Sequence, residues 1–400
     1  MAPRVALVHH WLIEQRGGER VLARLAEMLP GAELFTLLHD PERAPAPPQI
    51  SRVHTSSLQG VPGAQLGFRA LLPLLPSLYE RFNLRGFDLV LSSDASVAKC
   101  LRVPDDIPHL CYCYSPPRYV HDLRELYLSE SVPAALRPLA RRLLRGVAER
   151  DRRAAERVTE FVAISEHVAA RIENAYGRDA HVIAPPVDTQ FFTPCASAPT
   201  PANAPPPASA PRTERAYLLA GHAVPYKRFE VAVDACRELD RPLVVAGGGP
   251  RFDALRARAG ARTRFVDSPT DDALRTLYRD CRALLFPGEE DFGLVPVEAM
   301  ACGAPVIAWG VGGAAETVRH AETGWLYALD SNGTTPQAAS NPRNAPHAEH
   351  VAALAAALQA FEVWESGFEP AAAVRRAQAY SVLAFRNALF ERVRALTTRA

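Results

Sequence analysis

Residues 283–308, with the sequence ALLFPGEEDFGLVPVEAMACGAPVIA, contain a complete strand–turn–helix–strand unit. The first four residues form a short apolar run that is typical of a buried strand. A glycine-containing turn follows, and Pro296 indicates the first turn of a helix, where the missing N–H of proline costs nothing. Gly303 is predicted to end this helix before a second apolar strand at residues 305–308. Two strands joined by a helix predict a parallel sheet.

The same alternation of short apolar runs and helical patterns extends over most of the chain. Residues 18–28 have helical spacing, and a long helix is predicted from about residue 382 to 396. Strands that alternate with helices predict an α/β protein with doubly wound parallel sheets. The further predicted strands are residues 5–8, 87–92, 109–114, 161–165, 181–183, 217–220, 243–246 and 263–266.

Seven prolines within residues 194–211 divide this pattern into two halves. Such a segment buries too little apolar surface to order itself and is predicted to be a linker. We therefore expect an N-terminal domain at residues 1–193, a linker at 194–213 and a second domain at 214–377. Residues 378–400 are expected to form a helix that packs back on the first domain. A second polar stretch, residues 330–350, is predicted to be a loop or insertion.

Composition excludes several classes of protein. The 400 residues include 45 basic and 44 acidic side chains, and this balance argues against a protein that coats nucleic acid. No apolar run reaches the ~18–20 residues of a spanning helix, and the start of the chain lacks the pattern of a signal peptide. Seven cysteines lie mostly inside apolar segments, as reduced thiols do, so a cytoplasmic location is predicted.

The turn within residues 286–303 contains more candidate functional residues than any other segment of the chain. The amides of the helix start attract anions, most simply phosphate; these residues are Phe292, Gly293, Leu294 and Val295. Glu290 and Glu298 can face the same pocket, and carboxylates next to a phosphate are suited to sugar or ribose hydroxyls. Glu289 and Asp291 are interpreted as acidic residues that decorate a helix start. The residues by themselves predict a ligand with phosphate and hydroxyl groups.

The frame EDFGLVPVEAMACGAPVIA, in which seven residues separate Glu290 from Glu298, closely resembles the E-x7-E motif of the family 4 (group 1) retaining glycosyltransferases. Three other segments resemble motifs of that family: GGAAE at 312–316, GHAVPYKR at 221–228 and PPVD at 185–188. The frame is most similar to bacterial mannosyltransferases of surface-polysaccharide assembly. The resemblance implies a GT-B fold, in which two Rossmann-like domains face each other across a cleft. The first would bind the acceptor and the second the nucleotide sugar.

The resemblance also implies roles for single residues. Glu298 would hold the ribose hydroxyls, and Glu290 would grip the transferred sugar. Lys227 would neutralise the diphosphate, helped by His222, which stands where the family usually has arginine. The catalytic set is therefore predicted to be Glu290, Lys227 and His222. The donor-binding set is predicted to be Glu298, Phe292, Gly293, Leu294, Val295, Gly17, Gly18 and Gly221.

One feature of the composition supports the role of Lys227 independently. The 45 basic residues include only two lysines, Lys99 and Lys227, and all the others are arginine. A lysine in a glycine-started loop of such a chain indicates that a compact ammonium is needed there. Lys99 lacks this context and is interpreted as structural.

On the N-terminal side, Gly17 and Gly18 follow the first strand and open a helix. Glycines there allow a ligand to approach the backbone, although a plain tight turn fits the pattern almost as well. The acceptor-proximal or sugar-proximal residues are predicted to be His10, Tyr114 and Arg118. Tyr114 stands where the family usually has histidine. The turn is not a G-x-G-x-x-G, so a nicotinamide site is poorly supported.

A basic segment runs from Leu136 to Val158 and holds eight arginines among leucines and valines. A basic amphipathic helix can dock on anionic lipid, but a solvated face with mixed charges fits the same pattern. Docking would place the protein at the inner face of the plasma membrane, where a lipid-linked acceptor would be found.

The predicted function is retaining transfer of mannose from GDP-mannose to a lipid-linked saccharide in polysaccharide biosynthesis. No D-x-D pair occurs, and Cys111 and Cys113 have no partners at metal-ligand spacing, so no metal or other cofactor is expected. Three alternatives stay open. They are a UDP-sugar-dependent glycosyltransferase, a nucleotide-sugar epimerase or hydrolase of the same fold, and a non-catalytic nucleotide-sugar-binding protein, which the departures at His222 and Tyr114 make conceivable.

Overall fold

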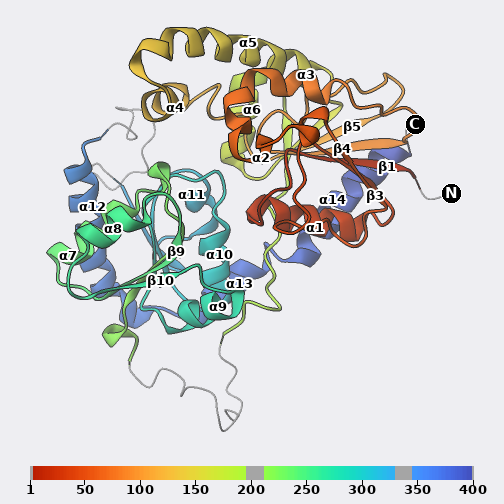
Figure 1. Cartoon of the computed structure of the whole chain (residues 1–400). Coiled ribbons are helices and arrows are strands. Elements are labelled where there is room, and N and C mark those ends of the chain that lie inside the picture. The colour runs from red at the N-terminus through yellow and green to blue at the C-terminus, as the bar shows by residue number, and fades with distance from the viewer. Residues whose placement is uncertain (1–2, 195–210, 329–344, 399–400) are drawn as a thin grey trace. The chain divides into compact units, whose positions relative to one another are not determined.

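The computed structural model describes residues 3–194, 211–328 and 345–398. The chain forms two compact units, Met1–Pro186 with Phe385–Ala400, and Val187–Ala384 (Figure 1). The predicted linker at 194–213 and the predicted loop at 330–350 lie largely outside the described residues. Among the described residues, no helix is both long and apolar enough to span a membrane.

A seven-stranded parallel sheet organises the first unit. Its strand order is β3-β2-β1-β4-β5-β6-β7. Because the chain runs outward from β1 to β3 and then returns to place β4 beside β1, the strand order reverses between β1 and β4. The strands are β1 (Val5–His9), β2 (Glu33–Thr36), β3 (Arg52–Thr55), β4 (Leu89–Asp94), β5 (His109–Cys113), β6 (Glu160–Ala163) and β7 (Ala180–Val182).

Helices complete this unit, and one of them comes from the end of the chain. Helix α14 (Val382–Thr397) packs Phe385 edge-on against Tyr112 of β5, and Arg392 donates two hydrogen bonds to Glu160 of β6. The C-terminal helix therefore closes the first unit through both an apolar and a charged contact. The other helices are α1 (Gly17–Met28), α2 (Ala64–Gly67), α3 (Leu75–Tyr79), α4 (Arg124–Ser131), α5 (Arg137–Glu156) and α6 (Glu166–Tyr176).

A six-stranded parallel sheet organises the second unit, with the order β10-β9-β8-β11-β12-β13. The order reverses between β8 and β11, so both units are doubly wound. The predicted α/β fold class is confirmed. The strands are β8 (Tyr217–His222), β9 (Leu243–Gly248), β10 (Thr263–Asp267), β11 (Leu284–Phe286), β12 (Val306–Trp309) and β13 (Gly324–Tyr327).

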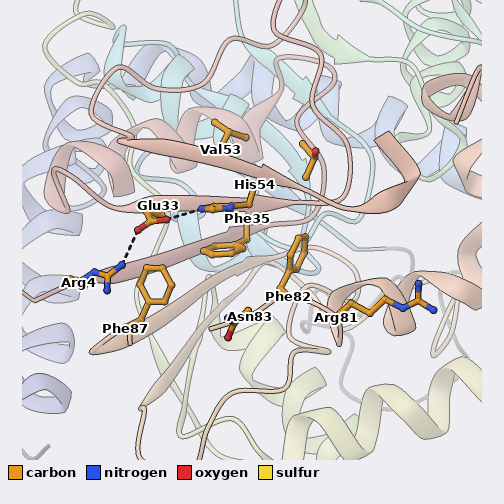
Figure 2. Close-up of a pocket in the computed structure, with 10 residues that line it drawn as sticks. Arg4, Glu33, Phe35, Val53, His54, Arg81, Phe82, Asn83 and Phe87 are labelled. Atoms are coloured by element: carbon orange, nitrogen blue, oxygen red, sulfur yellow. Dashed lines mark hydrogen bonds and ion pairs between the residues drawn. The ribbon is translucent and has the colours of Figure 1, made fainter. Parts of the chain in front are cut away.

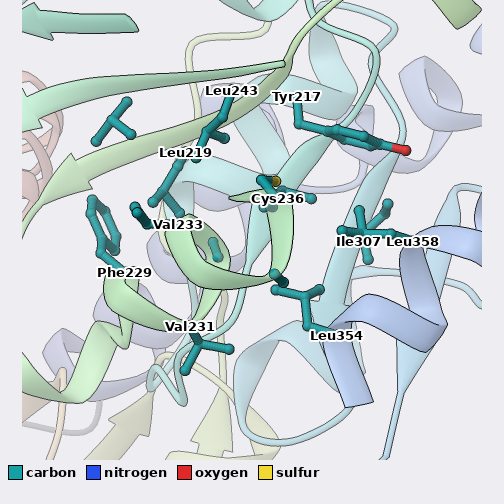
Figure 3. Close-up of a cluster of buried hydrophobic side chains, with 14 of the residues drawn as sticks. Tyr217, Leu219, Phe229, Val231, Val233, Cys236, Leu243, Ile307, Leu354 and Leu358 are labelled. Carbon is teal, nitrogen blue, oxygen red and sulfur yellow. The ribbon is translucent and has the colours of Figure 1, made fainter. Parts of the chain in front are cut away.

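An apolar core fixes the helices of the second unit on its sheet. Figure 3 shows Val233 and Cys236 of α7 among Leu219 and Ile307 of the sheet and Leu358 of α12, and all five are fully buried. Burial of this kind stabilises a fold by roughly 1.5–3 kcal/mol for each large aliphatic side chain. The helices are α7 (Phe229–Glu238), α8 (Phe252–Arg258), α9 (Asp271–Asp280), α10 (Leu294–Ala301), α11 (Gly313–Thr317), α12 (His347–Trp364) and α13 (Pro370–Gln378).

Lys99 is the centre of a buried ion cluster in the first unit. Its Nζ lies 3.2 Å from Oδ2 of Asp94 and 2.5 Å from Oδ1 of Asp151, and all three side chains are inaccessible to solvent. Tyr176 and His121 also contact Asp151. Because Asp151 belongs to α5, the cluster ties that helix to the end of β4.

Candidate functional site

Ligands of doubly wound sheets bind at the carboxyl ends of the strands, next to the point where the strand order reverses. In the second unit this point lies between β8 and β11, and the predicted residues Gly221, His222 and Glu290 all come at or just after the ends of these two strands. The short 3₁₀ helix η5 (Pro225–Lys227) follows β8 and carries the predicted lysine. The topology therefore gathers these residues at one edge of the sheet.

Lys227 and Glu290 form a direct ion pair. Nζ of Lys227 lies 3.0 Å from Oε1 of Glu290, and the two side chains are only 14% and 18% exposed. Burial by itself lowers the pKa of Lys227, but the neighbouring charges, first of all that of Glu290, outweigh burial and raise it. The ammonium is therefore charged at neutral pH.

Close backbone packing holds this pair in place. A Cβ added to Gly288 would lie 2.5 Å from Cα of Lys227, so only glycine lets the turn after β11 touch η5. A Cβ added to Gly313 would overlap the backbone of Phe292, and the N–H of Gly313 donates to the carbonyl of Glu290 at 2.9 Å. Because these two glycines have no side chain, the segment that carries Glu290 can pack closely between η5 and α11.

Glu298 lies one helical turn inside α10 and is buried. The hydroxyl of Tyr278, on α9, donates to Oε2 of Glu298 at 2.9 Å. Tyr278 is itself fully buried, so it fixes the rotamer of the carboxylate. The negative charge of Glu298 also contributes to the raised pKa of Lys227, which places the two groups in the same electrostatic neighbourhood.

The start of α10 directly follows the segment that carries Glu290. Gly293 is the N-cap, with φ of 86°, and Leu294 is the first helical residue. The ring of Phe292 packs at 5.5 Å against the ring of Tyr380 and so anchors the turn. The predicted helix start near Val295 is thus displaced by one residue.

Glu289 and His222 lie close to the Lys227–Glu290 pair, and the burial of Glu289 differs from the sequence interpretation. Glu289 is buried, although it was interpreted as decoration of a helix start; the interpretation was wrong because the turn folds inward against Gly312, whose added Cβ would lie 3.3 Å from Cγ of Glu289. His222 ends β8 next to Gly249, whose added Cβ would lie 3.0 Å from Cε1 of His222. Periodicity gave no signal for the burial of Glu289.

The first unit assembles a second cluster at its own point of reversal, between β1 and β4. His10 follows β1 and is buried, and the ring carbons of His10 and Tyr114 lie within 4.0 Å of a Cβ added to Gly18. The hydroxyl of Tyr114 donates to the carbonyl of Gly18 at 3.2 Å. Gly17 is the first residue of α1. The structure therefore brings together His10, Tyr114 and the glycine pair.

Glu19 is a member of this cluster that the sequence analysis missed. One of its carboxylate oxygens accepts from the N–H of Arg16 at 2.9 Å, and the other lies 3.4 Å from Nε2 of His9. A glutamate three residues after a helix N-cap is the signature of a capping box, which could have identified it. Glu19 joins the start of α1 to the end of β1.

Arg118 lies in a different arrangement, with Asp122. Nε of Arg118 is 3.8 Å from one carboxylate oxygen of Asp122, and Arg171 donates to the other at 2.6 Å. Asp122 therefore bridges two arginines from different segments of the first unit. This arrangement holds Arg118 in a mostly buried position.

Among the described residues, one group of three side chains has ligand atoms close enough to hold a metal ion: His9, His10 and Glu19, within 4.8 Å of one another. Nε2 of His9 already lies at hydrogen-bond distance from Glu19, and Nδ1 lies 3.0 Å from the hydroxyl of Ser93. We assign no metal to this group.

A separate hollow of about 470 Å³ lies in the first unit beside β2 and β3. Figure 2 shows Phe35 stacked on His54, with the ion pairs of Glu33 to Arg4 and His54 alongside. It lies beside the edge strand β3 and not at the point between β1 and β4 where the strand order reverses and ligands of such sheets bind. We therefore give it no part in the site.

Two family models match the chain. Residues 15–191 match glycosyltransferase family 4, and residues 203–333 match the glycosyl transferases group 1. Together they cover most of the described chain, including Gly18, Tyr114, Lys227, Glu290 and Glu298. The fold and the two matches define the class: the chain belongs to the family 4 (group 1) glycosyltransferases, with a GT-B fold.

Curated relatives and solved structures agree with this class. A D-inositol 3-phosphate glycosyltransferase of Salinispora arenicola is 35% identical over 205 residues, which span 45% of this chain and 44% of the relative. The corresponding protein of Salinispora tropica is 32% identical and is matched over 47% of its length, so the chain spans less than half of these relatives.

The solved structures show the fold over the whole chain. Sucrose-phosphate synthase from Thermosynechococcus elongatus superposes with a TM-score of 0.69, 20% identity and coverage of 99% of this chain and 100% of that one. Anabaena HepE in complex with UDP superposes with a TM-score of 0.62, 16% identity and coverage of 98% and 100%.

Proposed function

We propose that this protein is a retaining glycosyltransferase that moves a hexose from a nucleoside diphosphate sugar to a saccharide acceptor. The observation that carries the proposal is the buried Lys227–Glu290 pair, with Glu298 nearby, at the carboxyl edge of the second sheet. A cation for a diphosphate and carboxylates for hydroxyls are what a sugar nucleotide requires. This combination supports transfer more strongly than simple nucleotide binding, because Glu290 couples the diphosphate cation to the sugar.

In the proposed reaction the bond between the anomeric carbon and the diphosphate oxygen breaks, and a bond from that carbon to an acceptor hydroxyl oxygen forms on the same face. The hydroxyl proton passes to the departing phosphate. Lys227 and the amides at the start of α10, which begins at Leu294, would stabilise the charge on the leaving diphosphate. His222 would donate one further hydrogen bond. We propose that these groups suffice without a metal ion or other cofactor.

For the donor, we keep GDP-mannose as the hypothesis, on the resemblance to mannosyltransferases of polysaccharide assembly. A UDP-sugar is the alternative, and it is favoured by the superposition on HepE, whose structure contains UDP. Glu298 would bind the ribose of either donor, so the positions of Glu290 and Glu298 do not discriminate between guanine and uracil.

For the acceptor, we propose a lipid-linked saccharide that the protein reaches at the inner face of the plasma membrane. Leu136, Leu139 and Leu143 recur at helical spacing and are 54%, 58% and 47% exposed. Arg142 and Arg145 are exposed beside them. Exposed leucines flanked by arginines suit insertion into an anionic lipid surface better than a purely solvated face. The names of the Salinispora relatives favour a phosphorylated inositol as the alternative acceptor.

The decisive experiment incubates the purified chain with GDP-mannose, UDP-glucose and UDP-N-acetylglucosamine, each with a bacterial lipid extract or with inositol phosphate. Formation of a glycosylated product that requires the acceptor supports the proposal, and the anomeric configuration of the product tests retention. Sugar release without acceptor would indicate a hydrolase, and isomerised donor an epimerase. Stabilisation by a nucleotide sugar without any turnover would indicate a binding protein.

The membrane proposal has its own test. Vesicles that contain anionic phospholipid should sediment the protein at low salt, and Leu139→Glu with Leu143→Glu should abolish this. Leu383→Glu is the matched control, because Leu383 on α14 is equally exposed, at 56%, outside the basic helix. Sedimentation that survives the double change, or that is absent from the wild type, contradicts the proposal.

A further inference from the structure

Arg228, the residue after Lys227, has a backbone conformation that residues with a side chain rarely adopt. Its φ of 52° and ψ of 39° lie in the left-handed region, where the Cβ crowds the backbone. Among the described residues, four other than glycine have a positive φ, and Arg228 is the one that adjoins the Lys227–Glu290 pair. Such a conformation persists where the surrounding structure holds it, and it is common at functional sites.

The backbone of Arg228 joins η5 to α7. Its N–H donates to the carbonyl of Pro225 at 3.1 Å and closes η5, and its carbonyl accepts from the N–H of Val231 at 3.0 Å in the first turn of α7. The left-handed residue therefore sets the angle between η5, which carries Lys227, and α7. A change of φ at Arg228 would rotate Lys227 relative to the sheet.

The side chain of Arg228 is held by two residues from other elements. Its Cζ lies 5.0 Å from the centroid of the Trp309 ring, at the end of β12, in a cation–π contact. The guanidinium also donates to Nε2 of His350, in the first turn of α12, because arginine has no acceptor. The rings of Trp309 and His350 pack edge-on, with their centroids 5.0 Å apart. Trp309 and His350 together form a clamp for Arg228.

Both residues of the clamp are fixed in the interior of the second unit. Trp309 is inaccessible to solvent and His350 is almost completely buried. Leu354, one turn after His350 on α12, lies in the same buried apolar cluster as Phe229, the first residue of α7 (Figure 3). The clamp is therefore a rigid support for the side chain of Arg228.

The position of Lys227 depends on the junction at Arg228. Nζ of Lys227 lies close to the end of β8, 3.5 Å from a Cβ added to Gly221, and 3.0 Å from Oε1 of Glu290. The backbone of Lys227 is in close contact with Gly288. A rotation at Arg228 would move Lys227 away from these contacts.

We propose that Arg228 is a positioning residue whose side chain, held by Trp309 and His350, keeps residue 228 left-handed and so directs Lys227 onto Glu290. Arg228 and His350 then act on the reaction through Lys227. The effect on sugar transfer rests on the proposed function, whereas the position of Lys227 can be measured without a substrate.

NMR of the chain labelled selectively at lysine with nitrogen-15 and carbon-13 measures that position, because the sequence has only two lysines. Lys99, buried in the first unit, gives a reference signal. Glu290→Gln shows where the Nζ signal of Lys227 lies when its carboxylate partner is neutralised. Arg228→Ala should move the Lys227 signal most of the way to that position and leave the Lys99 signal unchanged.

Arg228→Gly separates the backbone conformation from the side chain. Glycine adopts the left-handed conformation without steric cost, so Arg228→Gly should keep the Lys227 signal close to its wild-type position. In the transferase assay, Arg228→Ala should lower kcat by about 10- to 100-fold with little change in donor KM. Arg228→Gly should keep kcat within about fivefold of the wild type.

His350 tests the clamp from the other side. His350→Leu should move the Lys227 signal and lower kcat in the wild-type background, but not in the Arg228→Gly background, where no guanidinium remains to be held. His350→Gln, which keeps an acceptor, should retain most of the wild-type kcat. Glu349→Gln, at the exposed neighbour of His350, is the matched control and should change neither the signal nor kcat.

Three results would overturn the positioning role. They are a Lys227 signal that stays at its wild-type place in Arg228→Ala, equal losses of kcat in Arg228→Ala and Arg228→Gly, and an effect of His350→Leu that persists in the Arg228→Gly background. If the Lys227 signal moves as expected but the wild type itself shows no transfer, the proposed function fails and the positioning role stands.

Discussion

Nζ of Lys227 lies 3.0 Å from Oε1 of Glu290, and this ion pair joins the two segments that follow the central strands β8 and β11. Both side chains are largely shielded from water, so their mutual attraction is stronger than that of a surface pair. A buried lysine with a single near carboxylate keeps donor capacity for a ligand, because an ammonium has three N–H groups. On the proposed function, the remaining N–H groups would contact the diphosphate of the donor.

Removing Lys227 should disable catalysis and leave the fold intact. Lys227→Ala and Glu290→Ala are each expected to lower transferase kcat by about 100- to 1,000-fold, as loss of one preorganised charge does in other enzymes. Initial rates with the nucleotide sugar that supports turnover of the wild type check this. Because Lys227 and Glu290 act as a unit, the kcat of the double variant should be only slightly lower than that of either single variant. Glu322→Gln, at a half-exposed surface carboxylate, is the control.

Gly288→Ala should damage the site through the backbone. The new Cβ would meet the main chain of Lys227 and push η5 away from the turn after β11. We expect at least a tenfold loss of kcat/KM with a drop in stability of about 1–3 kcal/mol. Gly367→Ala, where the added Cβ meets nothing within 4 Å, should change neither rate nor melting temperature. Wild-type activity in Gly288→Ala would show that the close approach is not needed.

Tyr278→Phe should affect nucleotide binding more than turnover. The change removes the hydrogen bond from Tyr278 that orients the buried carboxylate of Glu298. The expected cost is about 1–3 kcal/mol of folding stability and a several-fold rise in donor KM with little change in kcat. Titration calorimetry with the nucleoside diphosphate measures the affinity directly. A fall in kcat at constant KM would contradict the assignment of Glu298 to the nucleotide.

Lys99→Met should destabilise the first unit strongly. It leaves the buried carboxylates of Asp94 and Asp151 without their shared cation, and breaking such a pair costs about 3–5 kcal/mol. Arg102→Met, at a position that is 75% exposed, is expected to be neutral. Denaturant unfolding of both variants provides the comparison. Adding Asp151→Asn to Lys99→Met should recover part of the loss, because it removes one of the two unpaired charges.

The stability of the first unit should fall with pH below about 6.5. Burial lowers the pKa of His109 to about 4 and that of His10 to about 3. In the unfolded chain, the two histidines become protonated near pH 6.5, whereas in the folded chain they stay neutral until a lower pH. The free energy of unfolding therefore decreases from about pH 6.5 toward pH 4. His109→Gln should reduce the loss between pH 7.5 and 4.5 by about 2–3 kcal/mol. Urea midpoints at the two pH values measure this, and parallel profiles would contradict it.

The sequence predicted strands in the middle of both sheets and also the edge strands β7 and β10. β1, β4, β5, β8 and β9 are rich in buried apolar residues, and their observed bounds lie within two residues of the prediction. Three strands were missed: β2, β3 and β13. β3 is an edge strand with the polar sequence RVHT, and its partial exposure removes the apolar signal on which the prediction depends. Helix α12 was not predicted, and its first turn falls in the polar stretch that was expected to be a loop.

Sequence by itself determined the doubly wound α/β class and the candidate residues of the second unit. Apolar runs and glycine-bounded helices are local properties, and the E-x7-E spacing lies within one turn and one helix. Tertiary structure decided which side chains meet. Lys227 and Glu290 are 63 positions apart, and Glu19, His9 and Ser93 come from three elements, so only the return of the chain at the two points of strand reversal brings them together. Burial and nearby charges then shift the pKa values of Lys227 and Glu19, because both effects depend on everything packed around a group and not on its neighbours in sequence.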